Sequence, residues 1–154
     1  MDISLKIASL DDAELIWRMQ IAAIKPLLDK YQDYDYSPAA ETIDRTIQRL
    51  QGKRTDYYLI LADSNPVGAV RLIRLDGNRC RISPLFILSE YQGRSIAQTA
   101  LKQLESLYPN AEGWELHTIF QEEKLCHLYE KLGYRSTGQF KPVKEGMDLV
   151  LYIK

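Results

Sequence analysis

The sequence predicts an α/β (α+β) fold, with a mixed, mostly antiparallel central sheet flanked by about four helices. Two observations lead to this prediction. Seven short runs have the composition and flanking turn signals of strands, whereas four longer runs carry apolar residues at helical spacing. In chain order the elements read strand, two helices, three strands, helix, strand, helix and two strands. Consecutive strands favour hairpins, and the later strand–helix–strand units favour crossovers, so we expect a mixed sheet.

The N-terminal part is expected to form one strand and two helices. Apolar residues alternate with polar ones over residues 3–7, which is the period of a strand. A helix follows from about residues 9–11 to residue 27, and Pro26 is expected to kink or end it. Residues 30–38 are polar and rich in tyrosine and aspartate, which indicates a loop. A second helix is expected from Pro38 to about Gly52.

The middle of the chain contains three expected strands in two hairpins. Strand-like runs at residues 57–62 and 67–75 are joined by the turn residues 63–66. Asp76-Gly77 then separates the second run from a third at residues 79–88, which is a strong short-range hairpin signal.

The C-terminal part alternates helices and strands. Pro84 interrupts the third middle strand, and a proline cannot donate to a strand ladder, so we expect a bulge there. A helix is expected to open at Arg94 or Ser95 and to end before Pro109. The remaining expected elements are a strand at 114–120, a helix at 122–132, and strands at 134–140 and 147–153.

Length and composition favour one domain over residues 1–154. Lys and Arg total 20 and Asp and Glu total 21, so no global charge attracts nucleic acid or an anionic membrane. Cys80 and Cys126 have no metal-site spacing, so no metal is expected. The N-terminal sequence has no signal-peptide pattern and no apolar run approaches about 20 residues, which favours a cytoplasmic location with reduced thiols.

One strand-to-helix connection has the chemistry of an anion site. Around residues 85–97 a strand ends and a helix begins, and the first N–H groups of a helix have no partner inside it. Gly93 and the small side chains of Ser95 and Ala97 allow a ligand close to the backbone, and Arg94 adds a positive charge. The local pattern therefore predicts a bound phosphate or pyrophosphate. From this loop alone, an ordinary strand-to-helix connection is an equally good interpretation.

Two motifs resemble those of the GNAT superfamily of acyltransferases. Residues 92–97, Gln-Gly-Arg-Ser-Ile-Ala, resemble its Gln/Arg-x-x-Gly-x-Gly/Ala acetyl-CoA loop, with Ser95 where glycine is usual. Residues 128–134, Leu-Tyr-Glu-Lys-Leu-Gly-Tyr, resemble its second signature, with Tyr129 at the position of its thiol-contacting tyrosine. The element order agrees over nearly the whole chain. The resemblance implies a GNAT-type fold with a splayed, bulged central strand, which suits Pro84.

The resemblance also implies acetyl-CoA as co-substrate and a set of residues that bind it. Glu122 stands where many members carry a cofactor-contacting asparagine, and a carboxylate cannot donate as an amide does. The implied cofactor-binding residues are Leu85, Phe86, Ile87, Gln92, Gly93, Arg94, Ser95, Ile96, Ala97, Gln98 and Glu122.

Three residues are expected to carry catalysis. By the resemblance, Tyr129 is a general acid or hydrogen-bond donor to the departing thiolate, and the alternative is a core tyrosine on an apolar helix face. His117 lies on the strand where several members place a general base, and its ordinary pKa near 6.5 suits that role. Glu115 is two residues earlier and shares the strand face, so it is a second candidate. A surface histidine is the alternative interpretation of His117.

The loop between the first two helices is expected to receive the acceptor, because this region covers the acceptor site in the GNAT fold. Asp33 and Asp35 would attract a cationic amine, and Tyr31 and Tyr34 would pack against it. This composition suits a polyamine, an aminosugar or an amino-acid-like amine. A solvated loop whose aromatic side chains pack on the domain explains the same residues.

The resulting hypothesis is an N-acetyltransferase that moves an acetyl group from acetyl-CoA to a primary amine of a small molecule by direct attack. The alternatives are a non-catalytic acyl-CoA-binding or regulatory module on the same fold, and a protein-lysine or N-terminal acetyltransferase. A nucleotide-binding α/β protein is disfavoured, because the chain has neither a Walker motif nor GxGxxG. A homodimer through the final strands is also compatible with the resemblance.

Overall fold

The computed structural model of the protein describes all 154 residues and contains one seven-stranded sheet. The strand order is β1-β2-β3-β4-β5-β7-β6, and every neighbouring pair is antiparallel except β4 and β5. This confirms the predicted mixed, mostly antiparallel sheet. The strands are β1 (Ile3–Ile7), β2 (Thr55–Ala62), β3 (Asn65–Arg74), β4 (Arg79–Ile87), β5 (Gly113–Ile119), β6 (Arg135–Lys144) and β7 (Met147–Ile153).

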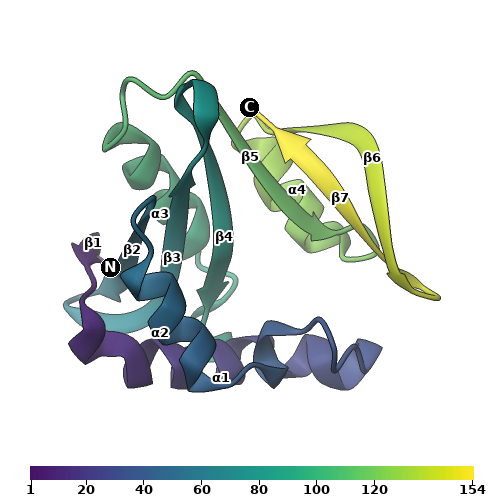
Figure 1. Cartoon of the computed structure of the whole chain (residues 1–154), viewed down its shortest axis with the longest axis horizontal. Coiled ribbons are helices and arrows are strands. Elements are labelled where there is room, and N and C mark those ends of the chain that lie inside the picture. The colour runs from purple at the N-terminus through teal and green to yellow at the C-terminus, as the bar shows by residue number, and fades with distance from the viewer.

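Four helices cover the two faces of the sheet (Figure 1). One hydrophobic core joins α1 to β2, β3 and β4, and a larger core joins α3 and α4 to the opposite face. No helix of this protein combines the length and the apolar character that crossing a membrane requires. The helices are α1 (Ala13–Tyr31), α2 (Ile43–Gln51), α3 (Ile96–Ser106) and α4 (Glu123–Lys131).

Two helix boundaries differ from the prediction. Helix α1 continues past Pro26 to Tyr31, so the proline does not end it and the expected loop begins two residues late. A proline removes only its own N–H from the ladder, and the remaining bonds of the final turns hold this helix together. Pro38 starts only a short 3₁₀ turn, Pro38–Ala40, which ends because Glu41 is extended; Ser37 caps its start by accepting a hydrogen bond from the Ala39 N–H. Helix α2 begins at Ile43 instead.

The central strands splay apart. β4 and β5 pair in parallel only where Arg79–Arg81 meet Gly113–Glu115, and beyond that point they diverge (Figure 1). On its other edge β4 pairs with β3, but the register shifts between Val70 and Leu72. Two β4 residues, of which one is Pro84, therefore stand opposite a single β3 residue, which confirms the predicted bulge.

Candidate active site

The corner between β4 and α3 leaves a run of backbone donors unpaired. None of the N–H groups of residues 93–98 donates a hydrogen bond to any atom of the chain. Gly93 has φ +78° and Ser95 has φ 61°, so both adopt the left-handed conformation. That conformation costs a non-glycine residue energy, which explains why glycine is usual at the position of Ser95. Gln92 holds the loop in place, because its amide donates to the Ile87 carbonyl at 2.8 Å.

The remaining corner residues divide into anchors and exposed groups. Ile96 is 2% exposed and fixes the start of α3 in the core. Arg94 is exposed, and its guanidinium lies over the Tyr91 ring at 5.7 Å from the centroid. Ala97 and Gln98 are half-buried in the first turn. The result is a positively polarised and accessible helix start, which is an arrangement that binds phosphate groups.

The end of β4 presents a free strand edge next to this corner. Leu88 donates its N–H to Val67 of β3, so alternation directs the N–H groups of Leu85 and Ile87 to the opposite edge. That edge has no partner, because pairing with β5 stops at Arg81. Phe86 and Ile87 are buried in the two different cores, one on each face of the sheet, which fixes the strand in position.

Tyr129 lies inside the α4 core with its hydroxyl unpaired. Its ring is 7% exposed and packs edge-on against Tyr134, with centroids 6.2 Å apart. The hydroxyl makes no hydrogen bond within the chain. Burial, followed by the influence of Cys126, raises the pKa of Tyr129 to about 12. This hydroxyl therefore remains protonated across the physiological pH range.

His117 and Glu115 share a face of β5 but differ in their partners. Arg81 donates two hydrogen bonds to one Glu115 oxygen, at 3.0 and 2.8 Å, so this carboxylate is already engaged. His117 makes no hydrogen bond through its side chain. His117 is exposed on β5, but partial burial of its ring and then Arg81 lower its pKa below the ordinary value of 6.5, against the opposing effect of Glu115. The imidazole is therefore neutral, and able to accept a proton, near pH 7.

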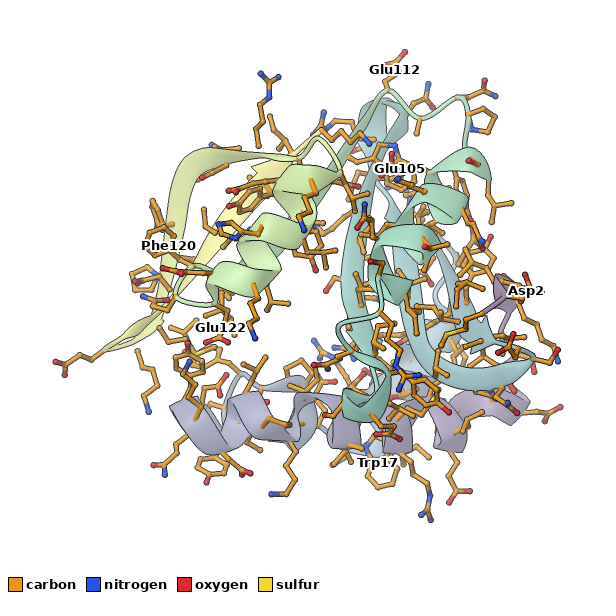
Figure 2. All side chains as sticks on the ribbon, turned by 180° about the vertical axis from the view of Figure 1, so that it is seen from behind. Asp2, Trp17, Glu105, Glu112, Phe120 and Glu122 are labelled. Atoms are coloured by element: carbon orange, nitrogen blue, oxygen red, sulfur yellow. The ribbon has the colours of Figure 1, made fainter.

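Glu122 turns toward helix α1. Its carboxylate accepts a hydrogen bond from Lys30 Nζ at 2.7 Å and a very short one from the Tyr31 hydroxyl. Burial opposes ionisation, but these two donors outweigh it, so the pKa of Glu122 lies below its ordinary value. Figure 2 shows Glu122 between the start of α4 and α1. The side chain therefore ties α4 to α1; a contact with a cofactor stays a prediction.

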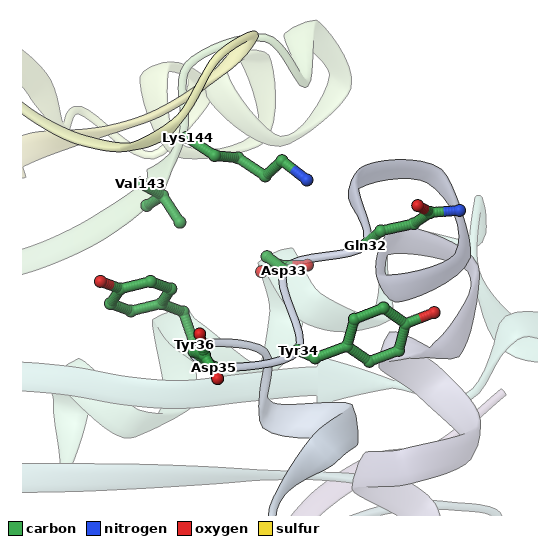
Figure 3. Close-up of a pocket in the computed structure, with 7 residues that line it drawn as sticks. All are labelled: Gln32, Asp33, Tyr34, Asp35, Tyr36, Val143 and Lys144. Carbon is green, nitrogen blue, oxygen red and sulfur yellow. The ribbon is translucent and has the colours of Figure 1, made fainter.

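Three of the four predicted acceptor residues line one cavity of about 240 Å³ (Figure 3). Asp33 is 7% exposed, and neither Asp33 nor Asp35 has an ion-pair partner. Tyr34 joins them, whereas Tyr31 points to Glu122 instead. The remaining lining residues are Gln32, Tyr36, Val143 and Lys144.

Sequence reasoning missed Arg81 and Lys144. Lys144 reaches over the cavity from the hairpin between β6 and β7 (Figure 3). More than a hundred residues separate it from Asp33, so no local pattern indicates the contact. Arg81 could have been expected, because an arginine and a glutamate paired across neighbouring strands attract each other.

The sheet order, the splayed and bulged β4, and the donor-rich helix start together define an α/β protein with a helix start of free N–H groups beside an open strand edge. The family model for "Acetyltransferase (GNAT) family" matches residues 21–134. The chain therefore belongs to the GNAT acetyltransferase family. Among curated proteins, none matches the chain.

Solved structures of acetyltransferases share the fold. Spermidine N-acetyltransferase from Vibrio cholerae, in complex with CoA and spermine, is 18% identical with a TM-score of 0.76, covering 99% of this chain and 94% of its own. The ribosomal-protein-S18-alanine N-acetyltransferase from Escherichia coli is 11% identical with a TM-score of 0.78, covering 99% and 92%. An acetyltransferase from Thermus thermophilus is 18% identical with a TM-score of 0.77, covering 100% and 97%. At these identities the likeness concerns the fold alone.

Proposed function

We propose that residues 1–154 form one acetyltransferase domain that moves the acetyl group of acetyl-CoA to a primary amine of a small molecule by direct attack. The observation that carries this proposal is the run of unpaired N–H groups at residues 93–98, beside the free edge of β4. Every helix start leaves its first N–H groups without a partner inside the helix, and here the free run extends back through the exposed loop to Gly93, so six adjacent donors are open to an anionic ligand.

The corner residues fit the cofactor. Residues 93–98 bind the pyrophosphate through their N–H groups, and Arg94 adds a cation beside it. The edge N–H groups of Leu85 and Ile87 and the C=O group of Leu85 pair with the amide groups of the pantetheine arm as an added strand would, while the Ile87 C=O accepts from Gln92. Acetyl-CoA supplies the activated thioester. The chain supplies position, which is a large part of the rate in a two-substrate reaction.

Tyr129 acts as the general acid. Its hydroxyl has no internal partner and stays protonated, with a pKa of about 12, so it is free to donate a hydrogen bond to the departing thiolate and to share its proton with it. Its packing against Tyr134 and Tyr152 fixes the ring direction.

His117 acts as the general base, and Glu115 acts through Arg81 as a positioning residue. The lowered pKa of His117 leaves it neutral near pH 7, whereas Arg81 already occupies the Glu115 carboxylate. A neutral imidazole can take the proton of the attacking amine, directly or through water.

The cavity beside Asp33 and Asp35 receives a cationic amine. Two carboxylates without internal partners attract a positive charge, and Tyr34 and Tyr36 offer aromatic faces to it. The named ligand of one structural neighbour, spermine, is a cation of this class. Polyamines, aminosugars and amino-acid-like amines are therefore the acceptors to examine first.

A turnover assay tests the proposal. Free CoA thiol is measured with acetyl-CoA and a panel of polyamines, aminosugars, amino acids and a lysine peptide. We expect turnover with at least one small amine, and Tyr129→Phe should lower kcat about 100-fold while CoA affinity stays the same. CoA binding without thiol release for every amine would instead establish a non-catalytic module. An unchanged kcat in Tyr129→Phe would show that Tyr129 has only a structural role.

A further inference from the structure

A second and larger cavity, of about 400 Å³, lies at the C-terminal end of α3. Three arginines line it, Arg54, Arg74 and Arg79, together with the apolar side chains of Leu75, Leu107 and Pro109. No aspartate or glutamate lines this cavity. It therefore combines concentrated positive charge with apolar walls.

Two of these arginines have acidic partners outside the cavity. Arg54 donates to Asp76 at 3.0 Å, but the Asp76 side chain is 97% exposed, so water screens this pair strongly. Arg74 pairs closely with Asp56, which also accepts a hydrogen bond from a tyrosine hydroxyl of the cavity wall. Each guanidinium has five donors, and these bonds occupy only some of them.

Arg79 has no hydrogen-bonded partner. Its nearest carboxylate oxygen, on Glu115, is 3.7 Å away, and Arg81 already holds that carboxylate at 2.8 Å. The Arg79 guanidinium packs against the backbone of Gly113, where a Cβ atom would come within 2.3 Å of it. Glu112, the acidic residue directly before Gly113, points outward from the tip of its loop (Figure 2). The Arg79 guanidinium is therefore fixed in position and still has free N–H donors.

This cavity is separate from the corner where the pyrophosphate is proposed to bind. The two places lie at opposite ends of α3, because the corner precedes Ile96 and the cavity begins at Leu107. A helix of 11 residues is about 16 Å long. A molecule the size of one phosphate or carboxylate cannot occupy both.

We propose that this arginine-lined cavity is a second ligand site, which binds a small organic anion with a carboxylate or phosphate group on an apolar body. The guanidinium groups pair with the anion, and Arg forks match both carboxylate and phosphate geometry. The apolar walls contact the body of the ligand. A neutral analogue of such a ligand offers only the apolar body, and an inorganic anion offers only the charge.

Site-resolved NMR titration tests the proposal on the full chain. The probes are phenyl phosphate and benzoate, with benzamide as the neutral analogue and inorganic phosphate as the anion without a body. We expect saturable shifts in the amides of residues 75–80, 107–108 and 110–111 with at least one organic anion. The amides of residues 93–98 report separately on the first corner. No saturable shifts around the cavity, or equal affinity for inorganic phosphate or benzamide, would overturn the proposal.

Variants assign the binding to the arginines. Arg79→Gln should lower the affinity for the organic anion at least about tenfold, as loss of a charge-assisted pair predicts. Arg54→Gln is the second variant, in case Arg79→Gln perturbs the fold, and melting curves monitor both. Arg18→Gln is the matched control, because Arg18 is an exposed arginine on α1 that pairs with a glutamate far from the cavity. Unchanged affinity in both cavity variants, or an equal loss in Arg18→Gln, would contradict the assignment.

Discussion

The two corners at which a strand passes into a helix differ in how their polar groups are used. Between β4 and α3, the N–H groups of residues 93–98 have no acceptor. Between β5 and α4, the corner is tied into the protein: Phe120 donates its N–H to Asp148, and the Gln121 side chain exchanges two further bonds with the same residue. Glu122 completes this corner by binding α1.

Because of this difference, the β4–α3 corner has donors available for a ligand, whereas the β5–α4 corner supports the fold. A corner whose donors are satisfied internally gains rigidity, and little remains for an external partner. In the β4–α3 corner, Gln92 and Ile96 fix the backbone instead. Its N–H donors therefore remain free for an external partner. Both corners flank the divergence of β4 from β5, so one side of this divergence has free N–H donors and the other has a corner fixed by internal hydrogen bonds.

The largest effect is expected on β5, the strand that enters the closed corner. If His117 is the base, His117→Ala should lower turnover at pH 7 up to about 100-fold with a strongly basic amine. Because the pKa of His117 is lowered, the acidic limb of the wild-type pH–rate profile should lie below pH 6.5, and the variant should lose that limb. Glu115→Gln is the comparison. A His117→Ala profile that overlays the wild type would show that His117 is not the base.

A smaller effect is expected from obstructing the open corner. Gly93→Leu should weaken CoA binding about tenfold, roughly 1.4 kcal/mol, because a side chain would stand where the ligand approaches the backbone. Calorimetry measures the affinity.

Gly138 provides a matched control for that experiment. It has φ +75°, Gly93 has φ +78°, and at both positions a Cβ atom would have no other atom within 4 Å. Gly138→Leu therefore carries the same backbone strain on β6, away from the corner. Both variants should lose similar stability, and only Gly93→Leu should lose CoA affinity. Equal affinities in the two would exclude the corner from the cofactor site.

The smallest effect is expected from loosening the closed corner. Glu122→Gln should lower the melting temperature by about 2–4 °C at pH 7, through the weakened bonds to Tyr31 and Lys30. The folded-state pKa of Glu122 is lowered, so its stabilisation is present above the ordinary value of 4.5 and disappears as pH falls through the folded-state value. The two melting temperatures should therefore converge once the pH lies below the folded-state pKa of Glu122. A difference that persists there would show that the carboxylate charge is not its cause.

Local patterns predicted the elements of this fold because each hairpin and helix carries its own signals. Asp76-Gly77 and Pro84 marked a turn and a bulge that the structure contains. Sequence spacing did not indicate that Pro26 would be tolerated, because neighbouring helix bonds decide that outcome.

The candidate site was less predictable from the sequence than the fold. The corner itself could be expected from residues 92–97, since a helix start always leaves donors free. The partners of Glu122 could not, because Lys30 and Tyr31 lie on α1, 92 and 91 residues away in the chain. Roles that depend on such long-range pairs require the structure.

The strand order has a consequence for how the chain is assembled. β7 lies between β5 and β6, although β6 precedes it in the chain. During synthesis, β6 therefore leaves the ribosome before β7, the strand with which it pairs. Until β7 is available, the edge of β5 that pairs with it has no partner. Local closure of the turn at Gly146 lets β6 and β7 form a hairpin first and then dock together onto β5. Pulse-labelling during synthesis should find β5 protected from exchange only after residue 153 has left the exit tunnel.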